Sequence, residues 1–117
     1  MGKIVNSGFT QGQISQLQKR VNFWAGKISE YAALIKEDET KVVRLQAVID
    51  DLKGTASTQI ERRQLAEYKN ELKTLRMRLI GLENQMFNYK CRQYTAREFS
   101  NLLGLGLEIK GIPDEAA

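Results

Sequence analysis

Three consecutive acidic residues, Glu37, Asp38 and Glu39, are the first candidates for chemistry in this sequence. Carboxylate oxygens suit hard cations, but successive residues of a helix point in three directions and cannot converge on one ion. The sequence also has no histidine, which removes the most common general base and metal ligand. We therefore expect no catalytic residues, no metal site and no cofactor, and a protein that is not an enzyme.

The single cysteine, Cys91, cannot form an internal disulfide, as is usual for proteins of a reducing compartment. No Gly-rich phosphate loop, paired-cysteine zinc pattern or nucleophile elbow is present. The first residues lack the apolar core of a signal peptide, and the longest apolar run, residues 102–107, is too short to cross a bilayer. These features predict a cytoplasmic protein with no membrane partner.

Apolar residues recur at alternate spacings of three and four along two segments of the chain, which is the heptad pattern of a coiled coil. In the first segment, heptad position a is β-branched throughout and holds Ile14, Val21, Ile28, Ile35, Val42 and Ile49. In the second segment, position a holds Leu65, Leu72, Leu79 and Met86. The pattern predicts two long helices with matching apolar rows.

The predicted helix ends carry their own signals. Thr10 with Gln13, and Thr58 with Glu61, have the spacing of capping boxes, in which two side chains satisfy the free N–H groups of a helix start. Gly54 is expected to end the first helix. Because the connection to the second helix is short, the two helices should run antiparallel.

The predicted fold is mainly all-α, an antiparallel two-helix coiled-coil hairpin that pairs Ile49 with Leu65 and Trp24 with Tyr89. Residues 3–5 and 105–112 are rich in β-branched residues and leucine, and we expect them to form a short β pair at the open end. We interpret residues 1–117 as a single domain. Its parts are an N-terminal arm 1–10, a helix 11–53, a turn 54–57, a helix 58–103 and a C-terminal arm 104–117.

One acidic residue interrupts the apolar rows, since Asp38 occupies position d between Ile35 and Val42. The hairpin places Asp38 opposite Arg76, whose guanidinium can reach over the seam between the helices. A buried ion pair adds little stability, but a slipped register would leave the carboxylate unpaired at a cost of roughly 3–5 kcal/mol. We predict that Asp38 and Arg76 set the register. In the alternative, the helices separate at this point and Asp38 contacts water.

Basic residues occupy nearly every e position of the second helix, along one line that we call the basic ridge. Three interpretations compete, of which the first is a solvated face whose long stems cover the seam. The second is an interface for acidic partners, and the third is contact with the phosphates of a nucleic acid or with a small anion. The third ranks last because base stacking needs aromatic side chains, which are absent from the ridge. The ridge residues are Arg62, Lys69, Arg76, Lys90 and Arg97.

Several apolar residues lie outside the a and d rows, where a single hairpin cannot bury them. All aromatic residues except Tyr68 map to the open end of the hairpin. We expect self-association into a helical bundle through that end, or coverage by a helix of a partner. The candidate interface residues are Phe23, Trp24, Ala25, Ala32, Leu34, Ile80, Phe87 and Tyr89.

The sequence thus predicts a non-enzymatic interaction protein that forms homo-oligomers and binds an unidentified protein partner. It would act as an adaptor, chaperone, assembly factor or inhibitor, for example as an accessory protein of a phage or mobile element. The alternative is a nucleic-acid or small-anion binding protein that uses the basic ridge. The salt dependence of binding separates the two, because phosphate contacts weaken steeply as salt rises.

Overall fold

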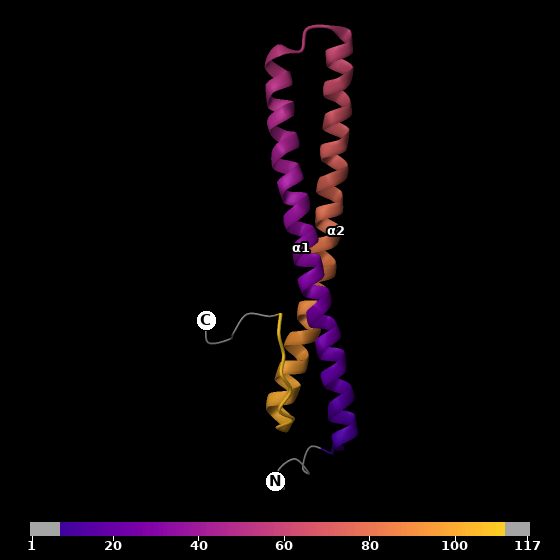
Figure 1. Ribbon diagram of the computed structural model, residues 1–117, viewed down its shortest axis with the longest axis vertical. Helices are drawn as coiled ribbons and strands as arrows, with labels where there is room; N and C mark the ends of the chain where they lie inside the picture. The colour runs from indigo at the N-terminus through magenta and orange to yellow at the C-terminus, as the bar shows by residue number, and fades with distance from the viewer. Residues whose placement is uncertain (1–7, 112–117) are drawn as a thin grey trace. The chain divides into compact units, whose positions relative to one another are not determined.

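The computed structural model describes residues 8–111, which consist almost entirely of two long helices (Figure 1). Helix α1 spans Gln11–Thr55 and helix α2 spans Gln59–Leu103. A short turn joins them and the chain reverses there, so the prediction of an all-α helical hairpin is confirmed. Within residues 8–111, neither helix combines the length and apolar character needed to span a membrane.

Both predicted capping boxes are present and fix where the helices begin. The backbone N–H of Gln13 donates to Thr10 Oγ1 at 3.1 Å, and the N–H of Thr10 donates to Gln13 Oε1 at 2.9 Å. Thr58 and Glu61 exchange the equivalent bonds at 3.0 and 3.1 Å. Each box satisfies N–H groups that have no partner within the helix.

Gly54 does not end α1, contrary to the sequence prediction. Helix α1 continues through Gly54 to Thr55, and the N–H of Ala56 still donates to the Leu52 carbonyl at 2.7 Å. A glycine C-cap requires a positive φ, and Gly54 does not have one. The first helix is therefore slightly longer than predicted and the turn is shorter.

Helix α2 does end at a glycine. Gly104 has a φ of 67°, and the N–H of Leu105 donates to the Ser100 carbonyl at 3.0 Å. This left-handed residue and the bond that follows it form a Schellman motif, which satisfies a carbonyl at the helix end. The chain leaves α2 in a defined direction as a result.

The chain divides into two compact units, and each contains part of both helices. Unit 1 is Met1–Tyr31 with Gln85–Ala117, and unit 2 is Ala32–Asn84. In the described part of both units, the predicted a and d residues are buried or half-buried, so the apolar rows form the interior. The most buried apolar residues are Val21, Ile28 and Leu105 in unit 1, and Ile35, Ile49 and Leu72 in unit 2.

Residues of the apolar rows have neighbours on more than one turn of the facing helix. In unit 1, Tyr89 stacks on Tyr31 with ring centroids 6.0 Å apart, one heptad beyond its predicted partner Trp24. In unit 2, Ile49 lines a groove with Leu72, one heptad beyond its predicted partner. A side chain in a coiled coil inserts into a hole formed by four residues of the facing helix, so it has neighbours on successive turns. The hydrogen bond from Gln93 Nε2 to the Val21 carbonyl, at 3.0 Å, agrees with the predicted pairing of the two rows.

The segment after α2, residues 104–111, folds back beside the helices of unit 1, and we call it the strap (Figure 1). No strand occurs within residues 8–111, so the predicted β pair is wrong for residues 105–111, and residues 3–5 lie outside the described part. Positive φ angles at Gly106 (72°) and Gly111 (89°) interrupt the extended conformation that a strand needs.

Two glutamine side chains bond to the backbone of the strap in place of a strand partner. Gln18 exchanges two hydrogen bonds with the backbone of Glu108, at 2.8 and 2.9 Å. Gln93 Nε2 donates to the carbonyl of Lys110 at 2.8 Å and also to the carbonyl of Val21 at 3.0 Å. The bonds to Glu108 and Lys110 satisfy backbone groups of the strap that the missing sheet would have paired.

Ser100 contributes a further contact to the strap, because its Oγ accepts a hydrogen bond from the N–H of Leu107 at 3.0 Å. Gln93 and Ser100 are 0% and 5% exposed. Both continue the a spacing of α2 beyond Met86, where the apolar row ends. The last two positions of this row therefore bond to the strap backbone, whereas the four positions before them are apolar.

Candidate functional site

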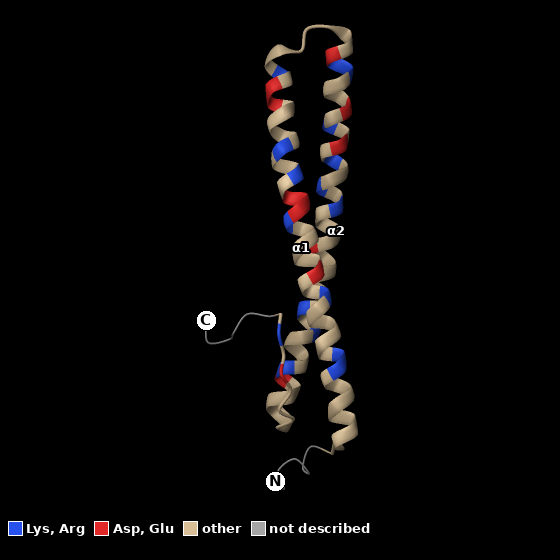
Figure 2. Cartoon of the chain, in the orientation of Figure 1, with Lys and Arg blue, Asp and Glu red and all other residues tan. Residues whose placement is uncertain are grey.

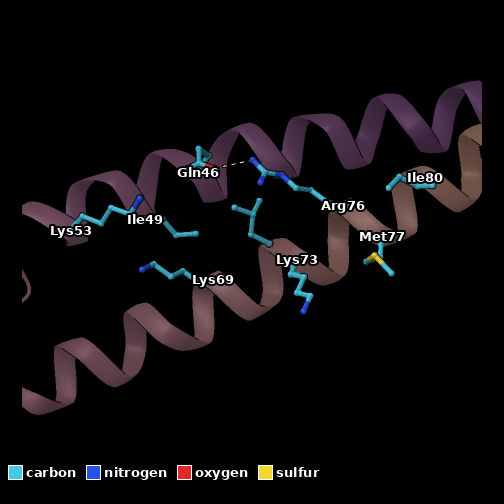
Figure 3. A pocket seen from close by; sticks show the side chains of 9 residues that line it. Gln46, Ile49, Lys53, Lys69, Lys73, Arg76, Met77 and Ile80 are labelled. Carbon is cyan, nitrogen blue, oxygen red and sulfur yellow. Dashed lines mark hydrogen bonds between the residues drawn. The ribbon is translucent and has the colours of Figure 1, made fainter.

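A groove with a volume of about 380 Å³ lies between the two helices of unit 2 (Figure 3). Helix α1 contributes three of its lining residues and α2 contributes the others. We call it the basic groove. It is lined by Gln46, Ile49, Lys53, Lys69, Leu72, Lys73, Arg76, Met77 and Ile80.

The floor of the basic groove is apolar. Ile49 and Leu72 belong to the a rows and are buried. Met77 and Ile80 lie outside these rows and remain 64% and 55% exposed. Removal of apolar surface from water is favourable by about 25 cal/mol per Å². A ligand with an apolar face therefore gains free energy by covering these two side chains.

Four cationic residues also line the groove, namely Lys53 of α1 and Lys69, Lys73 and Arg76 of α2. Arg76 is held in place by a hydrogen bond from its Nη2 to Gln46 Oε1 at 3.0 Å (Figure 3). No carboxylate lines the groove, and within residues 8–111 none of the three lysines forms an ion pair. The groove therefore presents positive charge that no side chain within it neutralises.

A second groove of unit 2, with a volume of about 480 Å³, differs in its charge. Its lining includes Glu71, and its Lys41 pairs with Glu37 at 3.5 Å. Figure 2 shows that acidic residues accompany basic ones on both helices of this unit. Asp50 lies outside the lining of the basic groove and accepts a hydrogen bond from Gln46 Nε2 at 3.0 Å.

No protein-family model, curated protein or solved structure matches this chain.

The structure brings only part of the predicted basic ridge into this groove. Of the four cations of the groove, Lys69 and Arg76 belong to the basic ridge, whereas Lys53 and Lys73 do not. Lys73 follows Lys69 by one helical turn and so shares its face of α2. The spacing of Lys69 and Lys73 is visible in the sequence, but Lys73 does not occupy an e position and so lies outside the ridge.

The other ridge residues have different surroundings. Arg62 turns back to the start of α2, where its Nη2 donates to the Ser57 carbonyl at 3.0 Å. Lys90 and Arg97 belong to unit 1, and the guanidinium of Arg97 lies 5.2 Å from the centre of the Tyr94 ring. The ridge residues therefore differ in their contacts, and two of the five line the basic groove.

Asp38 is paired with Arg78, and the prediction of Arg76 as its partner is wrong. Arg78 Nε lies 2.9 Å from Asp38 Oδ2, and the Asp38 side chain is 0% exposed. The alternative in which Asp38 contacts water is therefore also wrong. Arg76 bonds to Gln46 instead, which leaves the carboxylate to Arg78. The Arg78 contact lacks hydrogen-bond geometry, so neither oxygen of Asp38 accepts a hydrogen bond from a described residue.

The predicted interface residues differ in exposure. Phe23 and Phe87 are 57% and 64% exposed, and Ile80 belongs to the basic groove. Ala32 is also exposed. The Nζ of Lys27 lies 5.5 Å from the centre of the Phe23 ring and covers part of it. The half-buried members of the set are Trp24, Ala25, Leu34 and Tyr89.

Proposed function

We propose that the protein is a non-enzymatic, cytoplasmic interaction module whose basic groove binds an acidic amphipathic helix of a protein partner. The observation that carries this proposal is the presence of four cations and two exposed apolar side chains, Met77 and Ile80, in the lining of one groove. A helix with apolar residues on one face and acidic residues beside them complements both features. The protein would then serve as an adaptor, chaperone, assembly factor or inhibitor of that partner.

Charge and apolar contact contribute to such binding in different ways. Complementary charge speeds the encounter and selects acidic over basic helices. Burial of the floor supplies affinity, because full burial of a Met or Ile side chain contributes about 1.5–3 kcal/mol. Met77 and Ile80 are partly covered already, so each would contribute less than this. Substitutions in the floor and among the cations should both weaken binding.

Nucleic acid is the competing ligand for a cluster of cations. Phosphate contacts would use the lysines, but a phosphate backbone gains nothing from an apolar floor. Binding of single-stranded bases usually depends on aromatic side chains, and none of the residues that line the groove is aromatic. The apolar floor therefore favours a protein partner.

Calorimetry with two designed helical peptides tests the proposal. One peptide has a leucine face flanked by glutamates, and the other has lysine in place of every glutamate. We expect only the acidic peptide to bind, and Lys69→Glu with Lys73→Glu to weaken it at least about tenfold. The matched control is Lys36→Glu with Arg63→Glu, since both residues are exposed in unit 2 outside the groove. This control should bind nearly as well as the parent protein.

Floor variants separate a protein ligand from a nucleic acid. Met77→Ser with Ile80→Ser should weaken the acidic peptide several-fold, because it removes apolar contact without changing charge. A single-stranded oligonucleotide serves as the second probe. Tight oligonucleotide binding that is insensitive to the floor variant, together with no peptide binding, would replace this proposal with nucleic-acid binding.

The proposal includes self-association through unit 1. Its support is the exposure of Phe23 and Phe87, large apolar side chains that are costly to leave in water. We expect Phe23→Asp with Phe87→Asp to lower the mass measured by light scattering, and the groove variants to leave that mass unchanged. An unchanged mass in the aspartate variant would contradict self-association through Phe23 and Phe87.

A further inference from the structure

Unit 1 contains a pocket of about 340 Å³ that is lined by residues of α1, α2 and the strap. Most of its wall is apolar and includes Leu17, Trp24, Phe99, Leu105 and Leu107. The volume lies near the lower end of the range of about 300–1,000 Å³ that is usual for small-molecule sites. A compact ligand with a hydrocarbon body would match this lining.

Arg92 is the one charged residue in the lining of this pocket. Its guanidinium lies 6.0 Å from the centre of the Trp24 ring and 5.2 Å from that of Tyr89. Contacts with two ring faces fix the position of a cation without neutralising it. Within residues 8–111, no carboxylate forms an ion pair with Arg92. The pocket therefore combines an apolar wall with one positioned positive charge.

We propose that this pocket binds a small amphiphile with one carboxylate and a hydrocarbon chain, of the medium-chain fatty acid class. The carboxylate would meet Arg92, because a guanidinium presents parallel N–H donors that match two carboxylate oxygens. The chain would lie against Trp24 and the strap leucines. A single cation suits a monoanion better than a polyanion. This site is separate from the basic groove, since it lies in the other unit and takes a different ligand.

Binding of such a ligand is coupled to the strap, because Leu105 and Leu107 form one wall of the pocket. Ser100 Oγ accepts the N–H of Leu107 at 3.0 Å, which keeps this wall in place. A ligand that contacts these leucines binds the docked strap in preference to the undocked one, and so stabilises it. The ligand should therefore slow hydrogen exchange of the Leu107 amide.

The pocket contains two built-in reporters, since Trp24 is the one tryptophan and Cys91 the one cysteine of the chain. The test is a titration with decanoate, kept below the concentration at which it forms micelles. We expect a saturable change in Trp24 fluorescence, and protection of the exposed Cys91 thiol from a thiol reagent with the same midpoint. Decylamine, which has the same chain length and the opposite charge, should bind at least roughly tenfold more weakly.

Two variants test whether Arg92 is the residue that contacts the carboxylate of the ligand. Arg92→Gln should weaken decanoate binding roughly tenfold, because it removes a charge-assisted hydrogen bond. Lys19→Gln removes an equal charge from an exposed position of α1 outside the pocket and should change nothing. Because Arg92 also contacts Trp24, protection of Cys91 is the decisive readout for this variant, with helicity checked by circular dichroism.

Three results would overturn the proposal. The first is equal binding of decanoate and decylamine, and the second is decanoate binding that Arg92→Gln leaves intact. The third is Trp24 fluorescence that responds to protein concentration and not to decanoate, which would show that a second copy of the chain covers the pocket.

Discussion

Units 1 and 2 each have a polar side chain that is 0% exposed in the rows between the helices, Gln93 and Asp38, and the two side chains are bonded differently. In unit 1, Gln93 donates to backbone carbonyls of α1 and of the strap. In unit 2, Asp38 contacts the side chain of Arg78, which is itself 53% exposed. Gln93 therefore joins three segments of the chain, whereas Asp38 joins two side chains.

This difference indicates which polar site is replaceable. Loss of a buried partner leaves backbone groups unsatisfied, and each such group costs roughly 1–3 kcal/mol. A buried ion pair can instead be exchanged for packed apolar side chains with little loss, and often with a gain. Gln93 should be required for the strap of unit 1, and Asp38 should be dispensable for the stability of unit 2.

The largest effect is expected from Gln93→Glu. The new carboxylate would face the carbonyl oxygens of Val21 and Lys110, which accept hydrogen bonds in the present structure. A buried charge without a partner costs roughly 3–5 kcal/mol, and urea unfolding should show a loss of that size. Gln85→Glu is the control, because Gln85 is an exposed residue of the same helix and unit. Equal stability of the two variants would show that Gln93 does not bind the strap.

Gly111→Ala should release the end of the strap. A Cβ at this position would lie 3.1 Å from Ile28 Cδ1, and the φ of 89° is strained for any residue with a side chain. Backbone strain of this kind costs about 1–3 kcal/mol, and hydrogen exchange at Leu107 and Glu108 should accelerate accordingly. Gly8→Ala is the matched control, since Gly8 has a φ of 78° but no neighbour within 4 Å of its Cβ position. If both variants accelerated this hydrogen exchange equally, the positive φ would account for the effect without the contact to Ile28.

Asp38→Leu should raise the stability of unit 2 by about 1 kcal/mol, which thermal unfolding would show as a higher melting temperature. Arg78 can turn into solvent when its partner is removed, because it is already half exposed. The same variant should broaden the distribution of oligomers seen by native mass spectrometry, since no buried charge would then penalise a slipped register. A lower melting temperature with unchanged assembly would contradict this account of Asp38.

Glu61→Gln should have the smallest effect, and that effect should depend on pH. Hydrogen bonds from the backbone N–H groups of Thr58 and Ser57 lower the pKa of Glu61 in the folded protein. Its contribution to stability is therefore present above the unfolded pKa, about 4.3, and is lost as the pH falls through the lower folded pKa. The melting temperatures of parent and variant should differ at neutral pH and converge in acid. Glu67→Gln is the control, because Glu67 is exposed on the same helix. A difference in melting temperature between the parent and Glu61→Gln that persists in acid would contradict a contribution from the charged Glu61 side chain.

The helices and their starts followed from local sequence signals. Heptad spacing and the Thr10 and Thr58 capping boxes involve residues three or four positions apart, where helical geometry fixes which side chains meet. The partner of Asp38 did not follow, because long arginine side chains on either edge of a coiled coil can reach position d. In the structure, Arg76 donates a hydrogen bond to Gln46, and Arg78 contacts Asp38 instead.

The strap was the least predictable part of the fold. Gln18 and Glu108 are 90 positions apart, and no local pattern links them. Gln93 and Ser100 continue the spacing of the a row, but polar residues at these positions indicate only that the apolar row ends. Their hydrogen bonds to the strap backbone are not predictable from this spacing. The basic groove was half predictable, since Lys69 and Arg76 lie on one heptad position and Lys53 and Lys73 come from elsewhere.

The most direct test of the proposed function observes two methionine methyl groups by NMR during titration with the acidic helical peptide. Met77 lines the basic groove, and Met86 lies half-buried in unit 1 and serves as an internal control. We expect the Met77 methyl resonance to shift saturably while that of Met86 stays in place, and the lysine peptide to shift neither. A saturable shift of Met86 with Met77 unmoved would contradict the assignment of the basic groove as the partner site.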